Sequence, residues 1–313
     1  MMKKNHSVAL SQTINLSVLE FYPPKTEINQ LQTIILLNSS FFNQNQWNNG
    51  LKVLFSLLPE NHHFRFITYD YSGVGGSDYE NAKISIDNFM DEFFSILTYF
   101  DLQKVHVFGM SIGSWIALNL TAKYPQRIRS FVGYGNLAPY LPNFQLMRQK
   151  RFESIKESFV SIKTLSSHSI DENNWLTLFN QFYIPVFFDH IKSDNSENSF
   201  NNARRILAKI VYPMVKGNKM ALIPDYYDYI VNTMVKEGNE LLPLLTQISP
   251  LIPVMFLNGE IDPIAPPLMS SDLHSKIKHS KLEILPKLGH GSVILGKGNK
   301  KIMELYLEFI QNL

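Results

Sequence analysis

Residues 104–128, KVHVFGMSIGSWIALNLTAKYPQRI, decide the fold. The stretch begins with a short, almost continuously apolar run, which predicts a strand that is buried on both faces. Gly109-Met110-Ser111-Ile112-Gly113 follows at once, and a helical pattern continues until Tyr124 and Pro125 stop it. A strand, a tight turn and a helix in this order are the context in which a Gly-x-Ser-x-Gly turn presents a serine nucleophile. We therefore predict that Ser111 lies at the tip of such a turn.

The two glycines explain why this turn could carry chemistry. Side chains at Gly109 and Gly113 would collide across the turn, and the serine backbone between them is expected to be strained. Ser111 would then stand at a helix N-terminus, where the backbone N–H of Ile112 can donate to an oxyanion. The alternative is a turn serine that is bracketed by glycines and has no chemical role.

The composition excludes several classes of protein. The chain has 313 residues, of which 45% are hydrophobic and 18% charged, so it is expected to fold. Lys and Arg number 29 against 27 Asp and Glu, and this balance is too weak for a nucleic-acid binder. Cysteine is absent, which rules out disulfides, thiolate metal sites and a cysteine nucleophile. Any covalent nucleophile must be an oxygen or an amine, and we expect neither a metal nor a cofactor.

No stretch of the sequence has the pattern of a membrane span. Ser7, Ser11, Gln12, Thr13 and Asn15 interrupt the N-terminal stretch, so it lacks the apolar run of a secretory signal. No other segment reaches about 18 apolar residues without a charge. A cytoplasmic protein without a membrane span is the expectation.

Short apolar runs alternate with helical patterns, which is typical of an α/β protein with a mostly parallel sheet flanked by helices. One helix is predicted over residues 86–100, where Phe89, Phe93, Ile96 and Leu97 share a face, and another over 301–313. The predicted strands are TINLSVLEF (13–21), TIILLNS (33–39), FRFITYD (64–70), KVHVFGM (104–110), IRSFVGY (128–134), PVMFLNG (253–259) and KLEILPK (281–287).

The sequence pattern changes between residues 137 and 249, where strand-like apolar runs give way to helical patterns rich in aromatic residues. We interpret this segment as a helical insertion between two strands of the sheet and call it the lid. The predicted organisation is therefore a core domain of residues 1–136 and 250–313, interrupted by the lid at 137–249.

A nucleophilic serine needs a base, and the base needs a carboxylate that orients it. Asp262 follows the strand PVMFLNG, and His290 follows the strand KLEIL, so both lie at carboxyl ends of strands, where ligands bind in α/β sheets. Their order in the chain is serine, acid and then histidine. This is the order found where the nucleophilic serine lies on a turn between a strand and a helix. Asp262 could instead be only an Asp-Pro turn, and Glu260 is a rival for its role. His290 lies between Gly289 and Gly291, which predicts a sterically open loop.

The other histidines lack this placement. His62 and His63 are adjacent and could suggest a metal site, but neighbours in sequence do not share a face and no third ligand is evident. We interpret them as solvated loop residues.

These motifs together resemble the α/β-hydrolase fold superfamily, over nearly the whole chain from TIILL to the final helix. The segment DYSGVGGSD (70–78) matches the family's Asp-x-x-Gly-x-Gly-x-Ser turn. It is also close to a dinucleotide-binding fingerprint, but Asp78 stands where the third glycine belongs. The resemblance implies a serine hydrolase whose helical lid covers the cleft.

One departure from the family pattern concerns the loop after TIILL. Where many members have His-Gly-x, this chain has Asn38-Ser39-Ser40, and by position Ser40 would supply the second oxyanion N–H. A backbone donor does not depend on the side chain, so the function is expected to survive. Asn-Ser at this place is similar to the 3-oxoadipate enol-lactonase branch. The Asn and the segment 128–144 also resemble rhamnolipid-type hydroxyacyl transferases.

The lid is where we expect the acyl pocket, because a helical cap over a serine must present some apolar surface to the cleft. Candidate contacts are four aromatic residues, which could equally form the core of the lid: Trp175, Phe179, Phe182 and Tyr183. Two basic clusters, Arg148, Lys150 and Arg151, and Arg204, Arg205 and Lys209, are either solvated helix faces or a docking surface for an acyl carrier protein.

Three functions remain open from the sequence. The preferred one is a serine hydrolase that cleaves a carboxylic ester, lactone or thioester through Ser111, His290 and Asp262, with Ile112 and Ser40 as the oxyanion hole. The second is an acyltransferase or thioesterase that acts on carrier-bound acyl chains. The third is a non-catalytic binding module that has kept the fold.

Overall fold

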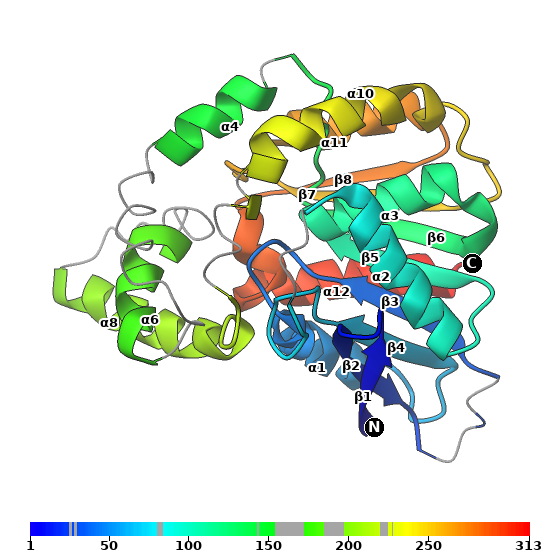
Figure 1. Ribbon diagram of the computed structural model, residues 1–313, viewed down its shortest axis with the longest axis horizontal. Helices are drawn as coiled ribbons and strands as arrows, with labels where there is room; N and C mark the ends of the chain where they lie inside the picture. The colour runs from blue at the N-terminus through cyan, green and yellow to red at the C-terminus, as the bar shows by residue number, and fades with distance from the viewer. Residues whose placement is uncertain are drawn as a thin grey trace.

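A single eight-stranded sheet organises the computed structural model, which describes residues 1–24, 27, 30–79, 84–142, 144–153, 172–184, 197–219, 225, 226 and 228–313. The order of the strands is β1-β2-β4-β3-β5-β6-β7-β8 (Figure 1). Their bounds are β1 (Met2–Ala9), β2 (Asn15–Tyr22), β3 (Gln32–Leu37), β4 (Phe64–Tyr69), β5 (Val105–Met110), β6 (Ile128–Tyr134), β7 (Val254–Gly259) and β8 (Lys281–Leu285).

The sheet is parallel except at one edge. β2 pairs antiparallel with β1 and with β4, and every other neighbouring pair is parallel. This confirms the mostly parallel α/β sheet, and each of the seven predicted strands is present. Five of them, β3, β4, β5, β6 and β7, have six or more residues of which nearly all are buried, as strands covered on both faces should be.

The sequence did not predict β1. Most of its side chains are exposed, so no apolar alternation marks it, and Lys3 and Lys4 lie near its start. It is held instead by backbone pairing with β2, from Met2 opposite Tyr22 to Ala9 opposite Asn15. A charged edge strand of this kind also blocks further strand addition.

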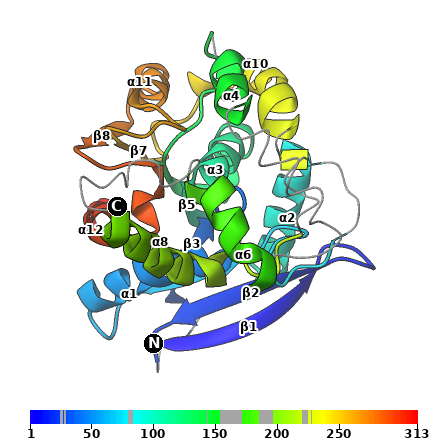
Figure 2. The same ribbon diagram turned by 90° about the vertical axis from the view of Figure 1, so that its left-hand side faces the viewer.

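Helices cover both faces of the sheet. α1 (Asn48–Leu57) and α12 (Gly296–Gln311) pack on each other on one face, whereas α2 (Ile86–Tyr99) and α3 (Ile112–Lys123) lie on the other (Figure 2). The predicted helices at 86–100 and 301–313 are thus confirmed. α11 (Pro267–Lys276) follows β7 and packs against it.

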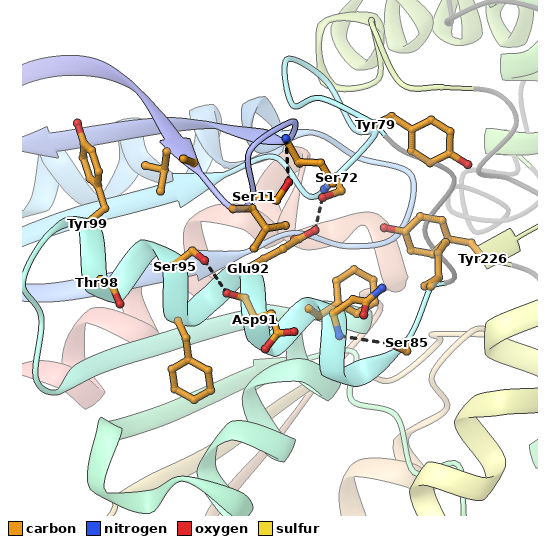
Figure 3. Close-up of a pocket in the computed structure, with 18 residues that line it drawn as sticks. Ser11, Ser72, Tyr79, Ser85, Asp91, Glu92, Ser95, Thr98, Tyr99 and Tyr226 are labelled. Carbon is orange, nitrogen blue, oxygen red and sulfur yellow. Dashed lines mark hydrogen bonds between the residues drawn. The ribbon is translucent and has the colours of Figure 1, made fainter.

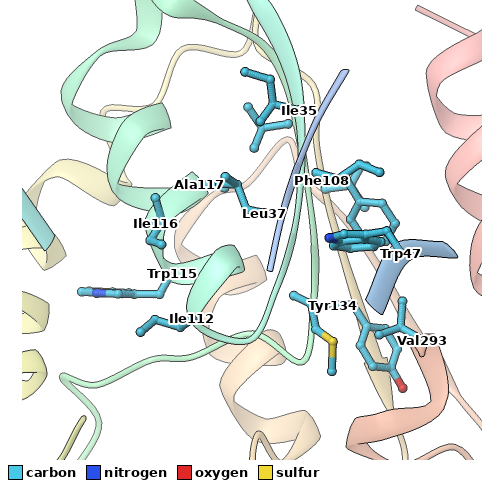
Figure 4. Close-up of a cluster of buried hydrophobic side chains, with 14 of the residues drawn as sticks. Ile35, Leu37, Trp47, Phe108, Ile112, Trp115, Ile116, Ala117, Tyr134 and Val293 are labelled. Atoms are coloured by element: carbon cyan, nitrogen blue, oxygen red, sulfur yellow. The ribbon is translucent and has the colours of Figure 1, made fainter. Parts of the chain in front are cut away.

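The core is thickest around β5 and α3. On one side of the strands, Trp47 and Phe108 pack together, with their ring centroids 5.2 Å apart, and on the other side α3 contributes Ile112 and Ile116 (Figure 4). Every residue of α3 from Ile112 to Thr121 is buried. The helix that follows the Gly-x-Ser-x-Gly turn is therefore fixed from all sides.

The lid lies in the chain between β6 and β7, and its described part consists of helices and turns. These are α4 (Phe144–Glu153), α6 (Glu172–Leu178), the π-helix η4 (Phe179–Tyr183), α8 (Glu197–Val211), the 3₁₀ helix η5 (Tyr212–Met214), the π-helix η6 (Tyr229–Thr233) and α10 (Met234–Leu245). This agrees with a helical insertion between sheet strands. The division into domains at residues 136/137 and 249/250 stays a prediction.

A substitution at Gly113 would measure how tightly the turn is packed. A Cβ at this position would lie 2.3 Å from the carbonyl oxygen of Leu37, which is backbone and cannot yield easily. We expect Gly113→Ala to lower the free energy of unfolding in urea by about 3 kcal/mol. Gly50→Ala in α1 is the control, because its nearest atom is the flexible Cε of Met303. Similar unfolding midpoints for the two variants would contradict this packing.

Candidate active site

Ser111 lies in a strained turn at the carboxyl end of β5. Its backbone has φ 55° and ψ −114°, a conformation that side-chain-bearing residues rarely adopt. The Ser111 N–H donates to the carbonyl of Tyr134 at 2.9 Å, and the Ser111 carbonyl accepts from Trp115 N at 3.0 Å. A Cβ on Gly109 would lie 2.2 Å from the Gly113 carbonyl oxygen, so the turn closes only with glycine at that position.

Asp262 and His290 form a buried pair. His290 Nδ1–H donates to Asp262 Oδ2 at 2.7 Å, and neither side chain is exposed to solvent. The other carboxylate oxygen, Oδ1, accepts the N–H groups of Ile264 and Ala265 at 2.8 Å each. These bonds fix the carboxylate, which in turn fixes the imidazole.

The rival carboxylate, Glu260, lies elsewhere. Glu260 is exposed, and its Oε2 accepts the N–H of Lys287 at 3.0 Å. The structure therefore brings Asp262, and not Glu260, to the imidazole.

The expectation that His290 occupies a sterically open loop is wrong. His290 is 0% exposed and begins the 3₁₀ helix η7 (His290–Val293). The carbonyl of the preceding Gly289 accepts the Tyr134 hydroxyl at 2.7 Å, and the Gly289 N–H donates to Ser292 Oγ at 3.0 Å. The two glycines therefore flank a histidine that is buried and held at the start of a 3₁₀ helix.

The ends of three strands converge on Gly135. Ser111 N–H donates to the Tyr134 carbonyl, and the next residue, Gly135, has φ 63° and lies close to the His290 imidazole. A Cβ on Gly135 would lie 2.9 Å from His290 Cε1 and 3.3 Å from Asp262 Oδ2. The end of β6, Tyr134 and Gly135, therefore lies between the serine turn and the Asp262–His290 pair.

The candidate oxyanion donors lie on two neighbouring segments. Ile112 is the first residue of α3, and the first N–H groups of a helix have no intrahelical acceptor. The Cβ that Gly113 lacks would meet both the Leu37 and the Asn38 carbonyl oxygens, so the loop after β3 runs directly against this helix start. Among the described residues, none accepts the Ser40 N–H.

Asn38, at the start of the loop that follows β3, is buried and hydrogen-bonded in the core. Its Nδ2 donates to the Tyr69 carbonyl at 2.8 Å, and its Oδ1 accepts from Trp47 Nε1 at 2.9 Å and from Thr68 Oγ1 at 3.3 Å. The Asn38 carbonyl accepts the Tyr71 hydroxyl at 2.9 Å. The side chain thus anchors the start of the loop.

The comparisons with known proteins agree with this geometry. A family model for the alpha/beta hydrolase fold matches residues 33–297, from β3 through the turn at Ser111 to His290. The chain belongs to the alpha/beta hydrolase fold family.

Individual relatives of this hydrolase-fold chain are distant. A Synechocystis sp. protein that carries the name of a non-heme chloroperoxidase is 23% identical over 288 residues, covering 90% of this chain and 91% of the relative. The enol-lactonase of Burkholderia xenovorans LB400 superposes with a TM-score of 0.69 at 15% identity, over 97% of this chain and 99% of that chain. An esterase from Exiguobacterium antarcticum gives 0.70 at 14% identity, over 98% of this chain and 100% of that chain. At these identities, the structural likeness establishes the fold.

The lid aromatics of this hydrolase-fold protein pack mainly on one another. Trp175, Phe179 and Tyr183 are buried, and the Trp175 ring lies 5.1 Å from Phe179 and 5.3 Å from Tyr183. Trp175 Nε1 donates to the Ala208 carbonyl at 3.0 Å. The side chain of Phe182 lies outside the described residues. Contact of these four residues with a substrate stays a prediction.

Sequence reasoning missed one polar residue of the lid, Asn218. Its Nδ2 donates to the Phe41 carbonyl at 2.8 Å, beside Ser40, and its Oδ1 accepts the Gly75 N–H at 2.9 Å. No local motif marks Asn218, because both partners are more than 140 positions away.

The paired histidines 62 and 63 separate. His62 is buried, where the expectation of a solvated residue is wrong, and its Nδ1 accepts the Phe64 N–H at 3.1 Å. Burial lowers the pKa of His62. His63 is exposed, as expected. Within the part of the chain that the structure describes, no group of three or more His, Cys, Asp or Glu side chains could hold a metal, and no helix has the length and apolarity of a membrane span.

A cavity of about 790 Å³ opens between the N-terminal strands and α2 (Figure 3). Ser111, Asp262 and His290 are not among the described residues that line it. Tyr226 lines it on one side and packs against Phe41 at a tilt, with ring centroids 5.2 Å apart. One aromatic ring thus stands between this cavity and the loop that holds Ser40.

Glu92 of α2 lies at the wall of the cavity. It accepts the Ser72 N–H at 2.9 Å (Figure 3) and is 3% exposed. Burial raises the pKa of Glu92 to about 7, and the hydrogen bonds from Ser72 lower it only in part.

This raised pKa predicts a pH-dependent stability. Between about pH 4.5 and pH 7 the folded state keeps a proton on Glu92 that the unfolded chain has lost, so folding binds a proton and stability falls as pH rises. Between pH 5 and pH 7 this loss amounts to about 2 kcal/mol, and we expect Glu92→Gln to remove it. Urea titrations at pH 5 and pH 7 would measure it, with the exposed Glu240→Gln as control. Equal pH slopes for Glu92→Gln and wild type would contradict the assignment.

Proposed function

We propose that the protein is a serine hydrolase that cleaves a carboxylic ester, lactone or thioester through an acyl-enzyme. The observation that carries the proposal is the buried Asp262–His290 hydrogen bond of 2.7 Å, placed against the strand end that also bonds Ser111. This arrangement supports Ser111 as nucleophile, His290 as base and Asp262 as orienting acid, in the chain order of the family.

In the first step, Ser111 Oγ attacks the substrate carbonyl carbon and its proton passes to His290 Nε2. Asp262 accepts the Nδ1–H bond, which selects the tautomer with a basic Nε2 and stabilises the imidazolium. Because Oδ1 of Asp262 is already held by two backbone N–H groups, the carboxylate cannot rotate away.

The tetrahedral intermediate carries its negative charge on the former carbonyl oxygen. The N–H groups of Ile112 and Ser40 are the proposed donors to this oxyanion. One such donor typically contributes about 10²–10³ in rate.

The intermediate collapses when the C–O or C–S bond to the leaving group breaks and His290 returns the proton to that group. In the second step, water gives a proton to His290 and its oxygen attacks the acyl carbon. The bond from the acyl carbon to Ser111 Oγ then breaks, His290 returns the proton to Oγ, and the acid leaves. An alcohol in place of water would give acyl transfer by the same steps, so the triad alone does not separate the two outcomes.

The lid and the relatives support the proposed substrate class. A serine that is only 5% exposed under a lid with an aromatic core suits an apolar acyl group. The likeness to an esterase and an enol-lactonase supports small esters and lactones. One alternative is acyl transfer or the cleavage of carrier-bound thioesters. The other is a non-catalytic binding module, which would leave every substrate unchanged.

The nucleophile can be tested directly with a fluorophosphonate. We expect wild type to gain one covalent adduct by intact mass, mapped to the peptide that contains Ser111, and Ser111→Ala to gain none. Ser114→Ala, which changes a buried serine in the helix that follows Ser111, is the matched control and should label like wild type. Unlabelled wild type, or a labelled Ser111→Ala, would refute the assignment.

The orienting acid gives a second prediction. Asp262→Asn keeps the shape but stabilises the wrong imidazole tautomer, so kcat for a p-nitrophenyl ester should fall by about 10⁴. Glu260→Gln, two residues away and exposed, should retain wild-type kcat. A larger loss for Glu260→Gln than for Asp262→Asn would mean that the carboxylates have been assigned the wrong way round.

A substrate panel separates the outcomes of the second step. Esters, lactones and acyl thioesters are each supplied with and without an alcohol acceptor, and acid and ester products are measured. We expect esters and lactones to give the free acid without any acceptor. Reaction of thioesters only, and only with an acceptor, would make the protein an acyltransferase.

A further inference from the structure

Phe41 occupies an unusual position beside the proposed oxyanion donor. It directly follows Ser40, is 5% exposed and has φ 65°, which costs free energy for a residue with a bulky side chain. The Phe42 N–H donates to the Ser39 carbonyl at 3.4 Å, so residues 39–42 form a tight turn. A turn with a strained residue keeps its shape only when surrounding contacts hold it.

Two lid side chains hold the carbonyl of Phe41. The Tyr183 hydroxyl donates to it at 3.0 Å and Asn218 Nδ2 donates at 2.8 Å. A carbonyl oxygen has two lone pairs, and these two bonds use both. The donors come from 142 and 177 positions further along the chain, from two separate segments of the lid.

Tyr183 is itself firmly placed. It ends the π-helix η4, is 0% exposed and packs between Phe42, at 5.5 Å between ring centroids, and Trp175, at 5.3 Å. π-Helical turns of this kind occur often at functional sites. The aromatic core of the lid therefore positions one hydroxyl over one backbone carbonyl.

Asn218 joins the lid to two loops of the core. Its Oδ1 accepts the Gly75 N–H at 2.9 Å while its Nδ2 bonds to Phe41. The segment around it is bonded to Asn43 as well, since Asn43 N–H donates to the Met214 carbonyl at 2.7 Å and Asn43 Nδ2 donates to the Lys216 carbonyl at 3.2 Å. This part of the lid is thus bonded to the loop that follows Ser40.

We propose that Tyr183 and Asn218 are positioning residues: by holding the Phe41 carbonyl they keep the Ser40 N–H aimed at the oxyanion, so the lid sets the rate of the chemical step. The inference rests on the proposed function, because it assigns Ser40 as a donor. Oxyanion donors act only when preorganised, and a small displacement removes much of their effect.

The variants remove one hydrogen bond at a time. Tyr183→Phe deletes only the hydroxyl, and Asn218→Asp replaces the donating NH₂ but keeps an acceptor for Gly75 N–H. Tyr226→Phe is the matched control, since its ring also packs on Phe41 while its hydroxyl makes no hydrogen bond with any residue that the structure describes.

The kinetic result expected is a loss in kcat with little change in KM. Tyr183→Phe and Asn218→Asp should each lower kcat for a p-nitrophenyl ester at least about fivefold, the factor that one neutral hydrogen bond contributes. Affinity for a trifluoromethyl ketone, whose adduct with Ser111 carries an oxyanion, should fall by the same factor. Affinity for the product carboxylate should stay within about twofold, which a general loosening of the lid would not allow.

Hydrogen exchange measures the loop independently of activity. We expect faster amide exchange in peptides covering residues 39–44 for Tyr183→Phe and Asn218→Asp, and wild-type exchange for Tyr226→Phe. If wild type turns over esters but kcat, ketone affinity and exchange in Tyr183→Phe match those of Tyr226→Phe, the inference is wrong and the proposed function stands. If wild type forms no ketone adduct and cleaves no ester, the proposed function fails, and with it the catalytic role of the two residues.

Discussion

The site depends on one close backbone contact, the packing of Gly113 against the carbonyl oxygens of Leu37 and Asn38. It forces the start of α3 against the loop after β3, and so brings the Ile112 N–H and the Ser40 loop to one place. The same packing leaves Ser111 at φ 55°, between a strand and a helix that are both buried. The strain is tolerated because the core on both sides of β5 and α3 fixes the two elements.

Around this contact, the carboxyl ends of the parallel strands supply the remaining groups. β6 ends at Tyr134 and Gly135, which bond the serine turn on one side and lie against the imidazole on the other. β7 leads to Asp262 and β8 to His290, and both side chains are buried. The lid then completes the arrangement from above, since Tyr183 and Asn218 bond to the loop beside Ser40.

Local patterns predicted the parts that local physics determines. Apolar runs marked the buried strands, and the glycines around Ser111 marked the turn, because each depends on neighbours in sequence. β1 was missed because an exposed edge strand is held by backbone pairing with no apolar pattern. The Gly289 carbonyl beside His290 accepts from Tyr134, 155 positions earlier, and Asn218 donates to Phe41, 177 positions earlier, so neither contact leaves a local signal.

If Ser111 is the nucleophile, it becomes covalently acylated during turnover. Rapid-quench mass spectrometry with a p-nitrophenyl ester detects this acyl-enzyme. We expect an acyl adduct on the peptide containing Ser111, which forms with the initial release of p-nitrophenol and decays at the rate of turnover. An adduct on another residue, or release of p-nitrophenol by Ser111→Ala at the wild-type rate, would contradict it.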